Sequence, residues 1–366
     1  MMNLSSREST YDDKTTHYSF AEFESTRANV THNRTSMHRT TEDTTFLIGT
    51  DPLPRVFRDL VVVIGVTGFI MNGIVLKAVL SKKLKKNTSN TFLTNQVIMG
   101  TMSSLLLIIV YSYKIGASHI YYEGAGGFLL CILLNSDILV FTVQVGSIAS
   151  LVVIAAERYF KIVHPILHKR HYKDWMTIAG ITFTWINGIL LNIAVFFTSK
   201  VESGNCYTFS VWPQAYSSKA YSYFLVTWQF LISLLLLVFF YGSILFTMRK
   251  RSRISLGTSF SRKDTENNVQ QKAQRSQMNV IFTMITISLA FALCWSPNQV
   301  HVILFLAANM LDDIMIYYYV SMLLIFFNTC LNPFIYASKH NMVRKNLKEM
   351  FLRTKATTTI DVLTIT

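Results

Sequence analysis

Charged residues are scarce in this chain of 366 residues. They make up 15% of the sequence, against about 25% in an ordinary soluble protein. This shortage argues against two or three soluble domains, which the length alone would allow. The first residues also lack the basic and then apolar pattern of a signal peptide, so we expect the first apolar run to direct membrane insertion itself.

Long apolar runs occupy much of the chain, and hydrophobic residues reach 51%. A helix needs about 20 apolar residues to cross the hydrocarbon core of a membrane. Seven stretches are long enough, at 57–80, 92–113, 128–156, 175–198, 221–248, 278–308 and 314–337. Backbone groups in lipid must be satisfied within the segment, so such runs are helices. The sequence therefore predicts an all-α membrane protein, with a seven-transmembrane helix bundle over residues 56–337.

Basic residues gather on one side of the predicted bundle. They are frequent in the connections that follow the first, third and fifth spans and in the segment after the seventh, whereas the opposite connections hold only Lys114, Lys200 and Lys219. Cytoplasmic connections are the basic ones. We therefore expect a multi-pass plasma-membrane protein with an extracellular N-terminus and a cytoplasmic C-terminus. The net charge of +14 then reflects topology, and no nucleic-acid partner is expected.

The two tails differ in their expected roles. Residues 1–55 are rich in Ser and Thr and predict a disordered extracellular tail, with glycosylation sequons at Asn3, Asn29 and Asn33. Residues 338–351 predict an amphipathic helix on the inner membrane surface, with Val343 and Leu347 among the residues facing lipid. Residues 352–366 form a Thr-rich cytoplasmic tail.

The four cysteines divide by position. Cys294 and Cys330 lie within spans and are expected to be small buried apolar residues. Cys131, near the outer end of the third span, and Cys206, in the second extracellular connection, both face the oxidising side. A disulfide between them is therefore expected, in preference to two unrelated thiols.

Three short motifs lie in or at the ends of the spans. They are Glu157-Arg158-Tyr159 at the end of the third span, Cys294-Trp295-Ser296-Pro297 in the sixth, and Asn332-Pro333-Phe334-Ile335-Tyr336 in the seventh. In this order and in these spans, the motifs resemble those of the rhodopsin-like (class A) G-protein-coupled receptors. The resemblance extends through most of residues 57–351 and includes landmarks that each match one family position: Asn72, Asn95, Trp185, Tyr241 and Phe291.

The resemblance implies a two-state switch that activates a heterotrimeric G protein. Arg158 could pair with Glu157 or reach toward the tyrosines of the fifth and seventh spans. Pro297 and Pro333 lack an amide hydrogen and kink their helices. Trp295, directly before the first kink, could sense a ligand through packing, and the sixth helix would swing outward to admit the G protein. Taken singly, Trp295 and Phe291 are better interpreted as core aromatic residues.

Three positions depart from the family pattern. Gly100 stands where these receptors usually carry the aspartate of a sodium site, so we predict weak or absent sodium modulation of ligand affinity. Ser233 replaces the usual proline of the fifth span, which predicts a straighter helix. Cys131 precedes Arg158 by 27 residues, two more than usual, which suggests an added part-turn or a bulge at the outer end of the third span.

The ligand is less specified than the fold. The seventh span contains no lysine for a retinal Schiff base, and Val140 occupies the position where amine receptors carry an aspartate. Asp137 is either a ligand counter-ion or a residue of the water-exposed mouth. Other polar and aromatic residues that could line the outer pocket are Gln144, Trp228, Gln229, Asn298, Gln299, His301 and Tyr318. This mixture favours a peptide ligand, with an amine or another small molecule as the alternative.

Other classes of protein are weaker interpretations. A transporter or channel would have internal repeats or paired intramembrane charges, and the sequence lacks both. Only one histidine, His301, lies in a span, so we expect no metal site, no cofactor and no enzyme activity. The threonines of the tail make it a candidate substrate for a receptor kinase, and phosphate groups there could recruit an arrestin.

Overall fold

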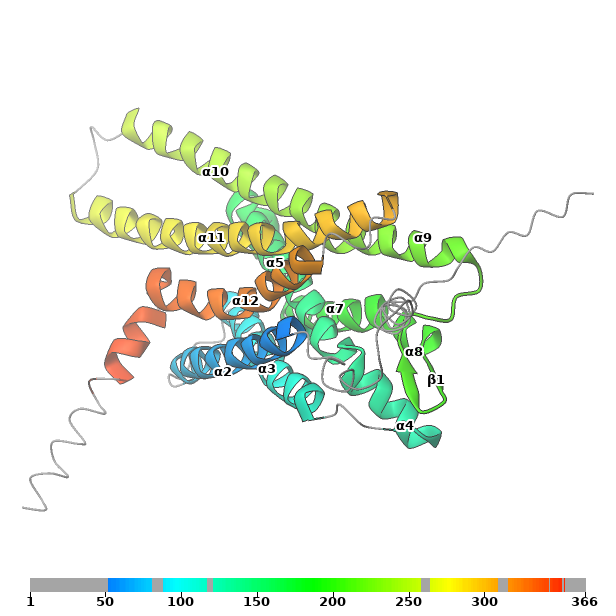
Figure 1. The fold of residues 1–366 in the computed structure, drawn as a ribbon. Coiled ribbons are helices and arrows are strands. Elements are labelled where there is room, and N and C mark those ends of the chain that lie inside the picture. Colours follow the sequence, from blue (N-terminus) through cyan, green and yellow to red (C-terminus); the bar gives the residue numbers. More distant parts are fainter. Residues whose placement is uncertain are drawn as a thin grey trace, which may run out of the picture.

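Seven helices long and apolar enough to cross a membrane lie in the part of the chain that the computed structural model describes. That part comprises residues 52–80, 88–116, 121–257, 264–308, 315–341, 343–350 and 352. Figure 1 shows the long helices lying side by side as a bundle. The predicted seven-transmembrane bundle is confirmed, and most predicted ends of the spans agree with the helices to within a few residues.

The first, second and seventh spans are single helices: α2 (Pro52–Leu80), α3 (Thr88–Gly116) and α12 (Met315–Lys339). The third span contains α5 (Ile138–Val163), and the fourth contains α7 (Asp174–Asn192) and the short α8 (Ala194–Thr198). The fifth combines α9 (Ala215–Leu225), the π-helix η2 (Val226–Ile232) and α10 (Ser233–Gly257), and the sixth belongs to α11 (Asp264–Ala308).

Helix α5 is the central element of the bundle. It contacts α3, α7 and α10, and 61% of its apolar window is buried, against 22% for the fourth span. The second span is fixed to its neighbours by polar contacts, because Asn95 accepts a bond from Trp185 Nε1 at 3.2 Å and donates to Ser150 at 3.4 Å. These bonds join the second, third and fourth spans, as interhelical hydrogen bonds do in membranes.

The third span begins differently from the prediction. A continuous helix from residue 128 was expected, but α4 (Gly124–Leu130) passes into the π-helix η1 (Cys131–Asn135) before a break. Asp137 then adopts a left-handed backbone conformation with φ 59°, and α5 starts at the next residue. The break explains the two extra residues between Cys131 and Arg158, so the bulge suggested by that spacing is confirmed.

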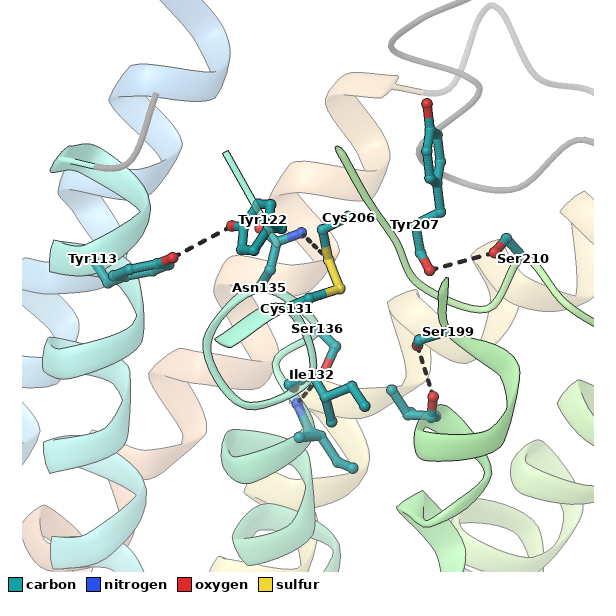
Figure 2. Close-up of a disulfide and its surroundings, with 12 residues drawn as sticks. Tyr113, Tyr122, Cys131, Ile132, Asn135, Ser136, Ser199, Cys206, Tyr207 and Ser210 are labelled. Carbon is teal, nitrogen blue, oxygen red and sulfur yellow. Dashed lines mark hydrogen bonds between the residues drawn. A yellow bond between two sulfur atoms is a disulfide. The ribbon is translucent and has the colours of Figure 1, made fainter. Parts of the chain in front are cut away.

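A small hairpin lies at the outer end of the bundle. Strands β1 (Lys200–Glu202) and β2 (Asn205–Tyr207) pair antiparallel, and Val201 faces Cys206. Ser203 and Gly204 make the turn with φ of 51° and 78°, a conformation typical of a tight hairpin. Cys206 forms the expected disulfide with Cys131, with their Cα atoms 5.5 Å apart (Figure 2). The hairpin is therefore fixed to the start of the third span.

The side of the bundle that was predicted to be cytoplasmic is more helical than expected. Helix α6 (Pro165–His171) follows the third span. The region 249–275, taken as a loop, is largely helical, because α10 and α11 run on to Gly257 and from Asp264 and extend together beyond the bundle (Figure 1).

The segment after α12 is helical at residues 341 and 343–350. Val343 is fully buried in the core, and Asn346 donates to the carbonyl of Ala78 on α2 at 3.0 Å. The expectation that Val343 faces lipid was therefore wrong. The segment packs against the bundle through Val343 and Asn346, and its place on the membrane surface stays a prediction.

Candidate functional site

The centre of the sixth span combines a proline with buried aromatic rings. Pro297 lies inside α11, so the carbonyl of Leu293 loses its helical N–H partner, and Ser296 Oγ approaches that oxygen to 3.5 Å. Just before the proline, Trp295 and Phe291 are 2% and 0% exposed, with ring centroids 6.0 Å apart. Phe291 also lies 5.9 Å from Phe230 on the fifth span. Two of the expected switch residues, Phe291 and Trp295, therefore pack together, and Phe291 also contacts the fifth span.

The seventh span also lacks a backbone hydrogen bond at Pro333, and a side chain from the first span supplies the missing donor. Pro333 leaves the carbonyl of Thr329 without its helical partner. Asn72 Nδ2 donates to that carbonyl at 3.1 Å and to the carbonyl of Gly68 at 2.9 Å. Asn72 is 1% exposed, so these bonds satisfy polar groups that water cannot reach. The first-span asparagine thus supports the proline motif of the seventh span.

Gly100 makes room for that asparagine. A Cβ atom added at Gly100 would lie 2.5 Å from Asn72 Oδ1, which is closer than atoms of these types approach. The position expected to carry a carboxylate therefore holds the amide of Asn72 beside bare backbone. Gln96, one turn earlier on α3, donates instead to Ser147 on α5 at 2.6 Å. The predicted weak sodium effect stays a prediction, and this geometry gives a physical reason for it.

Several buried polar atoms on the second and seventh spans are unpaired among the described residues. Asn328 Oδ1, Asn332 Oδ1 and Tyr336 Oη are buried and have no hydrogen-bond partner among the described residues. Gln96 Oε1 is also buried and has no hydrogen-bond partner among the described residues. Buried polar groups almost always have partners, and water commonly fills this role. The motif residues Asn332 and Tyr336 therefore have polar atoms available for a second arrangement of the helices.

The C-terminal end of α5 carries a group of charges centred on Glu157. This side chain is 3% exposed and lies 3.5 Å from Arg158 Nε, 3.6 Å from Lys161 Nζ and 4.0 Å from His168 Nε2. The approach of Arg158 is close enough for an ion pair but lacks hydrogen-bond geometry, so its Nε has no hydrogen-bond partner among the described residues. Arg158 is thus attracted to Glu157 without being locked to it.

A buried histidine lies close to these charges. His340, directly after α12, is 6% exposed, and its ring packs edge-on against Tyr336 with centroids 6.3 Å apart. Burial, followed by the positive charge of Arg158, lowers the pKa of His340 to about 4. His340 is therefore neutral at physiological pH. Burial likewise lowers the pKa of His168, while Glu157 opposes that shift.

The outer end of the bundle contains an ion pair that sequence reasoning missed. Lys114 Nζ on α3 lies 2.7 Å from Asp137 Oδ2, and each side chain is 16% exposed. Tyr111 Oη lies 3.4 Å from the same oxygen, and Lys114 Nζ lies 4.8 Å from the centroid of the Tyr111 ring. Asp137 Oδ1 is buried and unpaired among the described residues. The sequence signal for this pair was Lys114 itself, a basic residue at the predicted outer end of the second span.

Other expected pocket residues lie on three spans and differ in their contacts. The amide atoms of Gln144 on α5 and the Oε1 atom of Gln299 on α11 are buried and unpaired among the described residues. The His301 ring on α11 lies 5.3 Å from that of Tyr318 on α12. Asn298 Nδ2 lies 3.4 Å from Ser321 Oγ, which also joins these two helices. His301 Nδ1 is also buried and unpaired among the described residues, so the polar atoms of Gln144, Gln299 and His301 are available to a ligand.

The two fifth-span candidates lie on the π-helix η2. The Trp228 side chain is 42% exposed, and its Nε1 donates to Asn187 Oδ1 on α7 at 3.1 Å. Trp228 therefore lies along the seam between the fourth and fifth spans. Gln229 is partly buried. The expected glycosylation sites Asn3, Asn29 and Asn33 and the threonines of the C-terminal tail lie outside the described residues.

The two described outer connections contact each other near the disulfide, and Figure 2 shows the residues around it. Asn135 Nδ2 lies 3.2 Å from Cys206 Sγ, and Tyr113 Oη lies 3.4 Å from Tyr122 Oη. The backbone amide of Tyr122 also donates to the hairpin carbonyl of Gly204 at 3.0 Å. The first and second outer connections are thus bonded to each other and to the third span.

The sequence is similar to known receptors over most of its length. It is 22% identical over 288 residues to the pyroglutamylated RF-amide peptide receptor of Rattus norvegicus, covering 75% of this chain but only 65% of the relative. It is 24% identical to the melatonin receptor type 1C of Gallus gallus, covering 80% of this chain and 81% of that receptor. It is also 24% identical to the galanin receptor type 1 of Mus musculus, covering 78% of each chain.

The sequence model of one protein family, the 7 transmembrane receptor (rhodopsin family), matches residues 71–336 of this chain. This range includes all three motifs and the disulfide, and it confirms both the resemblance drawn from the motifs and the expectation that the protein is not an enzyme. The chain belongs to the rhodopsin family of seven-transmembrane receptors.

Proposed function

We propose that this receptor transmits the binding of an extracellular ligand to a heterotrimeric G protein across the plasma membrane. The N-terminus would be extracellular and the C-terminus cytoplasmic. The observation that carries the proposal is the charge group at the cytoplasmic end of α5, where Arg158 lies 3.5 Å from the buried carboxylate of Glu157 without hydrogen-bond geometry. Such a pair can be exchanged for contacts with a partner at modest cost.

The sixth span supplies the moving part. Above the charge group, the Trp295 and Phe291 rings pack beside Pro297, where the helix lacks a backbone hydrogen bond. A ligand that shifts this packing would favour one of two helix arrangements only to the extent that it binds that arrangement more tightly. The cytoplasmic half of α11 then swings away from α5, and Arg158 becomes accessible to the G protein.

A peptide is the favoured ligand. Lys114 already neutralises the carboxylate of Asp137, so an ammonium group would find no unpaired counter-ion there. The unpaired amide atoms of Gln144 and Gln299 suit hydrogen bonds with a peptide backbone or amide. Two of the relatives are named for peptides and one for melatonin. An amine or another small molecule is therefore the second candidate.

Regulation through the C-terminal tail is part of the proposal. The tail carries threonines at 354, 357, 358, 359, 364 and 366. Phosphorylation by a receptor kinase would add about −1.5 to −2 charges at each site. Such a negative tail would suit recruitment of an arrestin.

The test is signalling in cells that express the tagged receptor with a panel of G-protein biosensors and a library of peptides and amines. We expect a ligand-dependent or constitutive response that Arg158→Ala abolishes at unchanged surface expression. Lys77→Ala is the matched control, because Lys77 is a basic residue in the last turn of the first span and is not part of the charge group. Unchanged coupling in Arg158→Ala would contradict the proposed role.

A further inference from the structure

A cavity of about 220 Å³ opens at the cytoplasmic end of the bundle. Its walls come from the third, fifth and sixth spans and from the start of α6. The residues that line it are Arg158, Lys161, Ile162, Pro165, Arg251, Gln277 and Ile281. Three of these seven side chains are cationic, and no lining residue is acidic.

The described lining of this cavity is positively charged. Glu157, which is not one of the lining residues, lies 3.6 Å from Lys161 Nζ and 3.5 Å from Arg158 Nε. Arg251 on α10 adds a third cation to the lining. Across the cavity, α11 contributes the neutral Gln277. Like charges around a partly enclosed space repel each other, and a bound anion would relieve that repulsion.

We propose that this cavity binds a phosphate group. Phosphate presents several oxygen acceptors, and the cavity has donors on three sides: two guanidinium groups, one ammonium group and the amide of Gln277. Arginine donates to phosphate in a bidentate geometry, and lysine adds a compact charge. The apolar side chains of Ile162, Pro165 and Ile281 lower the local dielectric and strengthen these contacts.

The phosphate group could come from an inner-leaflet lipid or from a soluble phosphate compound. The cytoplasmic leaflet carries anionic headgroups, and basic groups near its surface attract them. The cavity lies on the basic side of the bundle, where Lys169 and Arg170 on α6 and Lys250 on α10 are also exposed. Both sources share the chemistry of the proposed site, so the experiment separates them.

The test uses the purified full-length receptor in nanodiscs of phosphatidylcholine, with no G protein present. Thermal unfolding is followed with a thiol-reactive dye, because the free thiols of Cys294 and Cys330 are buried in the folded protein. The probes are phosphatidylinositol bisphosphate in the bilayer, soluble inositol trisphosphate, and inorganic phosphate at matched ionic strength. A short peptide with a free terminal carboxylate serves as the comparison anion.

The critical variant is Lys161→Gln/Arg251→Gln, and the matched control is Lys169→Gln/Arg170→Gln. Each pair removes one lysine and one arginine from the same face, but Lys169 and Arg170 lie outside the cavity lining. We expect phosphate probes to raise the melting temperatures of wild type and control. Their affinity for the critical variant should be lower by about tenfold or more. The unliganded melting temperatures report whether the variants are folded.

Each outcome decides the proposal. Stabilisation by the lipid alone assigns the site to a headgroup, and stabilisation by the soluble probes as well assigns it to the phosphate group itself. Equal responses in the two double variants, or no response to any phosphate probe, would overturn it. A response to the carboxylate peptide alone would also overturn it and assign the cavity to an acidic protein segment. Because no G protein takes part, failure here is independent of the proposed signalling function.

Discussion

Single side chains in this receptor repair defects that the prolines create. Pro333 deprives the carbonyl of Thr329 of its helical bond, and Asn72 from another span supplies the missing donor at 3.1 Å. Asn72 can approach because Gly100 has no side chain. The absent carboxylate at Gly100 and the bonded amide at Asn72 are therefore two parts of one packing arrangement.

Gly100→Ala should destabilise the receptor. The new methyl group would lie 2.5 Å from Asn72 Oδ1 and displace the amide from Thr329, so we expect a loss of about 1–3 kcal/mol. Thermal unfolding of the purified receptor measures this loss of stability. Gly73→Ala is the matched control, because a Cβ atom there meets no other atom within 4 Å. Equal melting temperatures for the two variants would refute this packing arrangement.

His340 should make stability depend on pH. Its pKa is lowered to about 4 in the folded receptor but is near 6.5 when unfolded, so the unfolded chain binds the proton first as pH falls. Stability is therefore complete above about pH 6.5 and decreases toward pH 4, by about 2 kcal/mol at pH 5. Melting temperatures between pH 7.5 and 5 measure this slope. His340→Gln should flatten it, and an unchanged slope in that variant would contradict the assignment.

At the scale of elements, the spans could be predicted because lipid demands long apolar helices. The spacing of Cys131 and Arg158 indicated an irregularity at the outer end of the third span but not its position, since residues 136 and 137 contain neither glycine nor proline to signal a break. Asp137 adopts φ 59°, a conformation rare for residues other than glycine, and a lysine from another helix contacts its carboxylate. Such a contact between distant residues leaves no periodic pattern in the sequence.

The candidate site, like the fold, could be predicted only in part. The motif residues of the third, sixth and seventh spans could be named from their order, because each needs a specific residue type at a fixed place. The helical extensions over 249–275 were missed because their polar sequence has no apolar face. Val343 was placed toward lipid because periodicity identifies an apolar face without indicating what covers it.

The ion pair between α3 and the broken third span should contribute measurably to stability. Lys114 and Asp137 are each 16% exposed, so removing one leaves the other charge mostly buried and unpaired. We expect Lys114→Met and Asp137→Asn each to cost about 1–3 kcal/mol, and the double variant to cost less than their sum. A double-mutant cycle of melting temperatures measures this coupling. Purely additive effects would show that the pair contributes nothing beyond its separate members.

At the scale of the whole molecule, the receptor exposes apolar residues that a soluble protein would bury. Ile178, Phe197 and Leu293 are 66%, 71% and 72% exposed on three different helical segments, as expected of surfaces in contact with lipid. Polar contacts are concentrated inside and at the two ends. The outer end is fixed by a disulfide and a hairpin, while the inner end has an exchangeable charge group and a cavity. This asymmetry suits the proposed function, in which a ligand binds at the end that carries the hairpin and the helices move at the opposite end.

We expect the attraction between Glu157 and Arg158 on α5 to favour the arrangement in which Arg158 is not accessible to a G protein, so that weakening it favours the outward position of α11. Spin labels at Trp175→Cys on α7 and Phe282→Cys on α11, both exposed positions, report the distance between these helices by pulsed electron resonance. In nanodiscs without ligand, Glu157→Gln should populate longer distances than wild type, because it removes the carboxylate that attracts Arg158. Identical distance distributions in wild type and Glu157→Gln would contradict the account.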